Sequence, residues 1–260
     1  MRITRKIWDK YVEDLRKIND TAAKKIKEFF EGRTWANYSG PLTDQNYQAL
    51  IDYCFSITTK YGEAAAELTA QMYDAVAAAE KKAVEAAFPA ETASYDEVRK
   101  TVIGTMKTTE NADAIGASVA RLVKMAGVDT TMQNALRDGA EWAWIPRGMT
   151  CAFCIMLASQ GWQPASKKAI KNGHAEHIHA NCDCTYAIRF NSSSNVAGYD
   201  PDTYRAMYYN ADGRTGKQKV NSMRREFYAR NKEVINEQKR DAYAKREERN
   251  SSAAEEMNVT

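Results

Sequence analysis

Cysteine and histidine residues gather near the middle of this chain at spacings typical of a metal site. Four of the five cysteines and all three histidines fall within one window of 34 residues. Cys151 and Cys154 form a C-x-x-C pair, and residues three apart on a helical turn can face the same ion. A second group, His179-x-x-Cys182-x-Cys184, follows about 25 residues later. The two groups together predict a closed structural zinc site.

Five candidate ligands compete for the four places of a tetrahedral zinc ion. Cys151, Cys154 and Cys182 are the ligands that the spacing favours most. His179 and Cys184 are both suitable as the fourth ligand, and the sequence leaves this choice open. The other two histidines are expected to be solvated loop residues.

Two catalytic interpretations compete with a structural site. His174-Ala175-Glu176 has the H-x-E pattern of zinc deaminases, but it follows the C-x-x-C instead of preceding it, in a polar loop after Gly173. A His-metal type nuclease would use His177 or His179 with Asn181, although no following helix with a further ligand is evident. No phosphate-binding loop, G-x-S-x-G or H-E-x-x-H is present. We expect a protein that is not an enzyme, with this nuclease or a zinc-supported DNA-binding protein as the alternatives.

Charge is distributed unevenly along the 260 residues, whose net charge is +3. Residues 214–249 contain 12 Lys/Arg against 6 Asp/Glu, which leaves 25 against 28 elsewhere. A mildly acidic body with a basic tail is typical of a protein that meets phosphate or an acidic partner through that tail. The candidate nucleic-acid-binding residues are Arg224, Arg225, Arg230, Lys239, Arg240, Lys245 and Arg246.

Apolar residues at steps of three and four predict helices over most of the first half. Two long helices, over residues 3–29 and 47–79, are expected to pack as an antiparallel hairpin. A helix capped by Ser94 is predicted to reach about Lys107, and another to run from Asn111 to Gly127. A short helix over residues 130–138 is expected after that.

The pattern changes after residue 139, where short strands are expected. Residues 141–145 and 185–190 read as strands, and Thr150 is the expected cap of a helix from Cys151 to Ser159. A linker, a small helix after Pro201 and a charged helix over about 217–249 complete the pattern. Residues 250–260 are expected to be disordered.

The predicted fold is therefore mainly α with a small α+β unit. It combines a long N-terminal helical hairpin, a short antiparallel strand pair around a structural zinc site, and an extended charged C-terminal helix. We expect three segments: a helical region at 1–138, a zinc-clipped strand-helix-strand unit at 139–190, and a linker with the basic helix at 191–260. No secretory signal or membrane-spanning segment is expected, so no membrane partner is predicted.

The sequence around the cysteines resembles that of the Mu F-like minor head proteins of tailed phages. That family has a strand, a T-C-x-x-C-x-x-L turn, and a later H-x-x-C-x-C before a second strand. Here Thr150, Cys151, Cys154 and Leu157 match the first element, and the group that begins at His179 matches the second. The match covers about 50 residues, 141 to 190, and departs from the family where Ala180 replaces the usual proline.

The resemblance implies a structural virion component that takes part in head morphogenesis. Its implied partners are the portal protein, capsid or scaffold proteins, and packaged double-stranded DNA. Its implied location is the phage head interior or portal vertex, with the host cytoplasm as the site of assembly. A role in DNA packaging or ejection belongs to the same expectation, and Zn²⁺ would be a structural cofactor.

Overall fold

The structure is a computed structural model that describes residues 5–32, 44–109, 111–147, 150–166 and 184–257. It forms two compact units. Unit 1 comprises Met1–Thr150 and Gln160–Pro201, and unit 2 comprises Cys151–Ser159 and Asp202–Thr260. The three segments predicted at 1–138, 139–190 and 191–260 stay a prediction.

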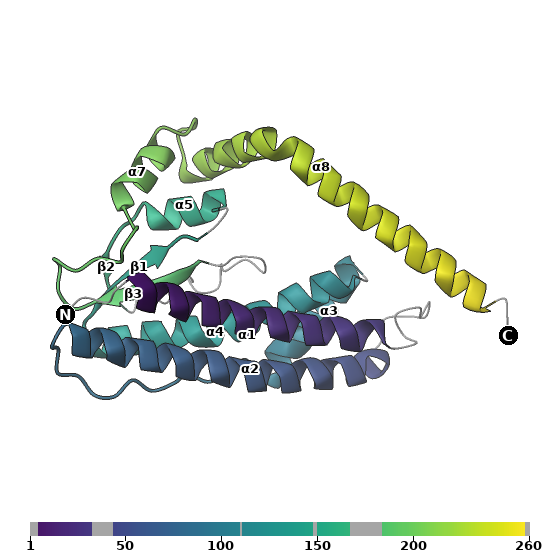
Figure 1. Cartoon of the computed structure of the whole chain (residues 1–260), viewed down its shortest axis with the longest axis horizontal. Helices are drawn as coiled ribbons and strands as arrows, with labels where there is room; N and C mark the ends of the chain where they lie inside the picture. Colours follow the sequence, from purple (N-terminus) through teal and green to yellow (C-terminus); the bar gives the residue numbers. More distant parts are fainter. Residues whose placement is uncertain (1–4, 33–43, 110, 148–149, 167–183, 258–260) are drawn as a thin grey trace. The chain divides into compact units, whose positions relative to one another are not determined.

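Two long helices open unit 1 and confirm the predicted antiparallel hairpin. Helix α1 spans Arg5–Glu31 and α2 spans Asp44–Ala79, and the two lie side by side in Figure 1. Their apolar stripes meet in the core, where Ile26, Leu50 and Ile51 are fully buried. The stripe spacing of three and four residues produces this packing, because it places the apolar side chains on one face of each helix.

Helix α4, Ala112–Asp138, packs against both helices of the hairpin. Asn111 caps it as predicted, but the predicted break at Gly127 is wrong, because one continuous helix runs through that position. Gly127 is a packing residue instead: a Cβ there would lie 2.9 Å from Thr69 Oγ1 of α2. Gly116 has the same role against α1, where a Cβ would lie 2.8 Å from the carbonyl oxygen of Ala23. Both glycines let helices approach closely.

Helix α3, Tyr95–Thr108, begins at the predicted cap. The Ser94 hydroxyl accepts a hydrogen bond from the Glu97 N–H, and the Glu97 carboxylate accepts one from the Ser94 N–H. This reciprocal capping box fixes the start of the helix. Its face with Val98, Val102 and Met106 is buried, and it packs against α2 and α4.

A small antiparallel sheet completes unit 1. Strand β1, Glu141–Ile145, lies between β2, Gln163–Pro164, and β3, Thr185–Arg189. The sheet therefore has one strand more than the predicted pair. Strand β2 was missed because its two residues are too few to show a sequence pattern. In the β1–β3 register Trp144 faces Tyr186 and Trp142 faces Ile188. The Tyr186 ring packs edge-on against both indoles, at centroid distances of 4.5 and 4.6 Å.

Three helices form unit 2. Helix α5 spans Ala152–Ala158, α7 spans Pro201–Tyr209 and α8 spans Gly216–Met257 (Figure 1). The first turns of α8 pack against α5 in a small core, whose buried members are Ala152, Ala211, Val220 and Met223.

Helix α8 is longer than the sequence pattern predicted. The expectation of disorder at residues 250–260 is wrong for residues 250–257, because the helix continues to Met257, and residues 258–260 lie outside the described residues. Its last turns are rich in alanine and glutamate, which favour helix, and contain neither proline nor glycine. Within the described ranges, no helix of the protein has both the length and the apolar character that a membrane crossing requires.

Candidate metal ligands and basic helix

Cys151 and Cys154 lie together at the start of α5. Cys151 is the N-cap, and its sulfur accepts a hydrogen bond from the Cys154 N–H at a donor–acceptor distance of 3.4 Å. The sequence predicted Thr150 as the N-cap, which is one residue before the observed N-cap, Cys151. A thiol can take the capping position because its sulfur accepts an amide hydrogen bond, as a serine oxygen does. Cys154 is 1% exposed, whereas Cys151 is half-buried.

The geometry of this pair suits a cation held by thiolates. An N–H group directed at sulfur and the positive end of the helix dipole both favour the negatively charged form of a thiol. The i and i+3 positions on the first turn also bring both sulfurs to one side of the helix. The donor set of Cys151 and Cys154 thus fits half of a tetrahedral zinc site.

The other candidate ligands are less completely described. Cys184 is 2% exposed and directly precedes β3. His179 and Cys182 lie outside the described residues, so the choice between His179 and Cys184 stays open. Within the part of the chain that the structure describes, no group of three or more His, Cys, Asp or Glu side chains is placed to hold a metal.

Cys54, the cysteine outside the window, is a core residue. It is fully buried on α2, and burial raises its thiol pKa to about 12. A thiol in this state stays protonated and packs as a small apolar side chain. None of the described cysteines is part of a disulfide.

The predicted nucleic-acid-binding residues lie on α8. Arg224, Arg225, Arg230 and Arg240 are exposed, and the side chains of the other three, Lys239, Lys245 and Arg246, lie outside the described set. Arg230 forms an ion pair with Glu226 at 3.2 Å. Arg224 donates to the Asn221 side-chain oxygen at 3.5 Å. The predicted nucleic-acid-binding residues therefore differ in their contacts within the helix, since Arg230 already forms an ion pair.

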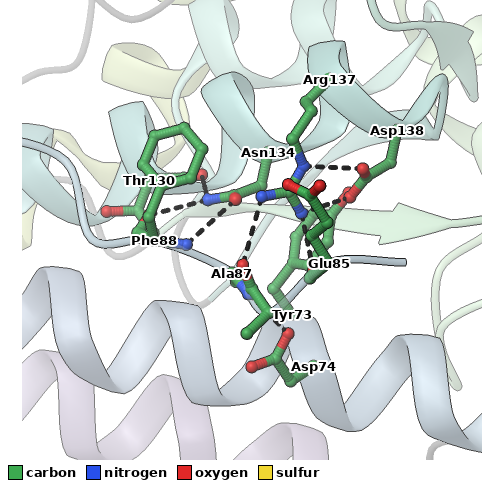
Figure 2. Close-up of polar contacts among 10 residues, drawn as sticks. Tyr73, Asp74, Glu85, Ala87, Phe88, Thr130, Asn134, Arg137 and Asp138 are labelled. Atoms are coloured by element: carbon green, nitrogen blue, oxygen red, sulfur yellow. Dashed lines mark hydrogen bonds and ion pairs between the residues drawn. The ribbon is translucent and has the colours of Figure 1, made fainter. Parts of the chain in front are cut away.

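Sequence reasoning missed a set of contacts that hold the segment between α2 and α3. Residues 82–93 form no helix or strand, and α2 and α4 hold them through the main chain (Figure 2). The Ala87 N–H donates to Asp74 Oδ1 at 2.8 Å, and the Ala90 N–H donates to Thr130 Oγ1 at 2.9 Å. We call residues 82–93 with these α2 and α4 contacts the clamp.

Arg137 and Asp138 extend the clamp beyond these two bonds. The Arg137 guanidinium donates to the carbonyls of Glu85 and Ala86, at 2.8 and 3.2 Å, and to the Asp138 carboxylate at 2.7 Å (Figure 2). The bond from Arg137 holds the pKa of Asp138 below its usual value, and burial raises the pKa of Tyr73, which donates to Asp138 at 2.9 Å. The sequence signal for these contacts was a polar residue, Asn134, among the apolar residues of a long helix. The predicted helix end at Gly127 hid this signal, because it assigned Asn134 to a separate short helix.

These features define a mainly helical protein with a small antiparallel sheet, a thiol pair that opens α5, and a long basic helix. The chain belongs to the VG15 protein family, whose model matches residues 2–211. This is a family of viral and phage gene products, which indicates a phage-encoded protein. No curated protein and no solved structure matches the chain. The finer resemblance to Mu F-like minor head proteins stays a prediction.

Proposed function

We propose that this phage protein is a structural minor head protein that acts in head morphogenesis. It associates with the portal protein and with capsid or scaffold proteins, at the portal vertex and in the head interior. Its role extends to DNA packaging or ejection, and it carries out no catalytic turnover. The protein is assembled into the head in the host cytoplasm.

The observation that carries this proposal is the order of elements around the cysteines. Strand β1 is followed by a helix whose N-cap and third residue are Cys151 and Cys154, and Cys184 directly precedes β3, the antiparallel partner of β1. This is the order that the Mu F-like resemblance implies for its strand, its cysteine turn and its second strand. The family match, which includes this region, supports a phage protein.

A structural zinc ion is part of the proposal. Cys151 and Cys154 hold it, together with Cys182 and either His179 or Cys184, a ligand set that rests on the sequence spacing. Four protein ligands leave no open position, so the ion supplies stability and not a reactive water. Zinc in such a site joins segments that are distant in sequence and thereby contributes to folding.

The proposal is tested by isolating heads from cells infected with the phage that encodes this chain. We expect an affinity-tagged chain to sediment with procapsids and to retain portal protein after a high-salt wash. A tagged chain that stays in the free-protein fractions, with heads and portal elsewhere in the gradient, contradicts the proposal. Cleavage of plasmid DNA by purified protein with Mg²⁺ or Mn²⁺ contradicts its non-catalytic part.

A further inference from the structure

Helix α8 carries a line of basic residues along one of its faces. Successive residues of an α-helix are rotated by about 100°, so residues seven apart return to nearly the same face. Basic residues occupy four such positions, namely Arg225, Lys232, Lys239 and Arg246, which we call the basic stripe. Five of the six acidic residues of this part of the helix fall on the other half of its circumference, namely Glu226, Glu233, Glu237, Asp241 and Glu248, and Glu247 lies nearer the stripe.

The first two stripe residues lie on the side of α8 that unit 2 leaves exposed. Val220 and Met223 direct the opposite side into the small core with α5, at 8% and 7% exposure. Arg225 and Lys232 are both exposed. Packing within unit 2 therefore orients the helix so that these cations face solvent.

The sequence gives the stripe residues no acidic neighbour at the spacing of the ion pairs that usually neutralise a charged helix. Such pairs form between residues three or four apart. Every position at that distance from a stripe residue is occupied by a neutral or basic side chain, as Asn221, Ser222, Tyr228 and Ala229 show around Arg225. The contrast is Arg230, which lies on the acidic face and pairs with Glu226 at 3.2 Å. A solvated helix of alternating charges does not explain this arrangement.

Regular spacing of cations that have no acidic neighbour three or four residues away fits a regular polyanion. Seven residues advance a helix by about 10.5 Å, so the stripe presents a positive charge at that interval along one line. Double-stranded DNA carries a phosphate charge for about every 1.7 Å of its axis, and lysine and arginine bind it by releasing counterions. A coiled-coil partner fits less well, because its recognition charges flank the apolar seam, whereas these lie opposite the packed side.

We propose that the basic stripe binds the phosphate backbone of double-stranded DNA, without regard to base sequence. This refines the residue set predicted from sequence: Lys232 joins it, and Arg224, Arg230, Arg240 and Lys245 fall outside the stripe. Helix α8 begins at Gly216, after the family match ends at residue 211. The proposal rests on the proposed function only in taking packaged DNA as the polyanion.

Two charge-matched variants of the full chain test the proposal. Arg225→Gln/Lys232→Gln/Lys239→Gln removes three stripe cations, and Arg230→Gln/Arg240→Gln/Lys245→Gln removes three cations from other faces of α8. Binding to a fluorescent duplex of random sequence is measured by anisotropy between 50 and 300 mM salt, with roughly 0.9 counterions released per phosphate contact. Circular dichroism verifies that both variants keep their helix content.

We expect the stripe variant to bind DNA at least about tenfold more weakly, with a salt slope lower by about 2 to 3, while the control variant changes by less than about threefold. Equal losses in the two variants, or no DNA binding by the wild type, overturn the proposal. Stripe-dependent binding to poly-L-glutamate without binding to DNA assigns the surface to an acidic protein and also overturns it. The stripe variant is also tested for portal association in the sedimentation assay. If it still associates with portal protein, a failure of DNA binding overturns this proposal and leaves the proposed function standing.

Discussion

The Asn134 carboxamide forms two hydrogen bonds with the main chain of Phe88, which lies 46 residues earlier in the sequence. The Phe88 N–H donates to Asn134 Oδ1 at 3.1 Å, and Asn134 Nδ2 donates to the Phe88 carbonyl at 2.9 Å (Figure 2). Asn134 is fully buried on α4, and it also donates to the Thr130 carbonyl. A single side chain thus joins α4 to the clamped segment by recognising backbone rather than side chains.

Replacing Asn134 by alanine is expected to lower the free energy of unfolding by about 2–3 kcal/mol. The change removes both bonds to Phe88 and leaves an amide and a carbonyl without their partner in a partly buried place. Urea denaturation measures the loss. Gln71→Ala is the control, because exposed Gln71 donates a hydrogen bond to Glu67 one helical turn away, and it is expected to change stability by less than about 0.5 kcal/mol. Similar losses of unfolding free energy in the two variants would contradict a stabilising role of the Asn134 contacts in the clamp.

Asp129 of α4 predicts a pH dependence of stability. Burial, with a smaller contribution from the charge of Glu97, raises the pKa of Asp129 to about 6. An unfolded aspartate has a pKa of about 3.9, so folding favours the protonated form. The resulting stability is fully present below about pH 4 and is lost as pH rises through about 6.

Asp129→Asn, which cannot ionise, is expected to be more stable than wild type at pH 8 by on the order of 1–3 kcal/mol. The difference should shrink toward zero as the pH falls to about 4, where both proteins carry a neutral side chain. Urea midpoints at several pH values measure it. Midpoints of the two proteins that move in parallel across this range exclude Asp129 as the titrating group.

Replacing a helical glycine by alanine usually stabilises a protein, but Gly116 of α4 is expected to give the opposite result. Gly116→Ala is expected to destabilise the protein by about 1–3 kcal/mol, because its Cβ would meet the Ala23 carbonyl at 2.8 Å and backbone cannot rotate away. Gly104→Ala on α3 is the matched control: its Cβ meets nothing within 4 Å, so we expect a gain of up to about 1 kcal/mol. Thermal denaturation compares them. A stabilised Gly116→Ala protein would falsify close helix contact at this residue.

The proposed zinc site predicts a metal content that depends on two cysteines and not on a third. We expect about one zinc ion per chain in wild-type protein and in Cys54→Ala, and a large loss in Cys151→Ser/Cys154→Ser. Mass spectrometry of protein purified without added metal gives the stoichiometry, and a chelator should lower the melting temperature of wild type only. Equal zinc content in all three proteins rules out the pair as ligands.

Local patterns in the sequence were sufficient for most helices and for two of the three strands. The hairpin of α1 and α2, the cap at Ser94 and the strands at 141 and 185 follow from apolar spacing and from side chains that act within a few residues. Strand β2 did not, because two residues carry no periodicity and their pairing depends on β1. The cap at Cys151 was assigned one residue early, since a thiol is an uncommon capping group.

By itself, the sequence determined the helical class of this protein, the placement of its cysteine pair and the seven-residue spacing of cations on α8, because each is a relation between near neighbours. Tertiary structure decided what those neighbours could not. It made Gly127 a contact point instead of the predicted helix end, it brought Gly116 against α1, and it placed the Asn134 side chain on the backbone of Phe88. It also determined which face of the first turns of α8 is packed and which is exposed. These depend on segments that are distant in the chain and meet only when it folds.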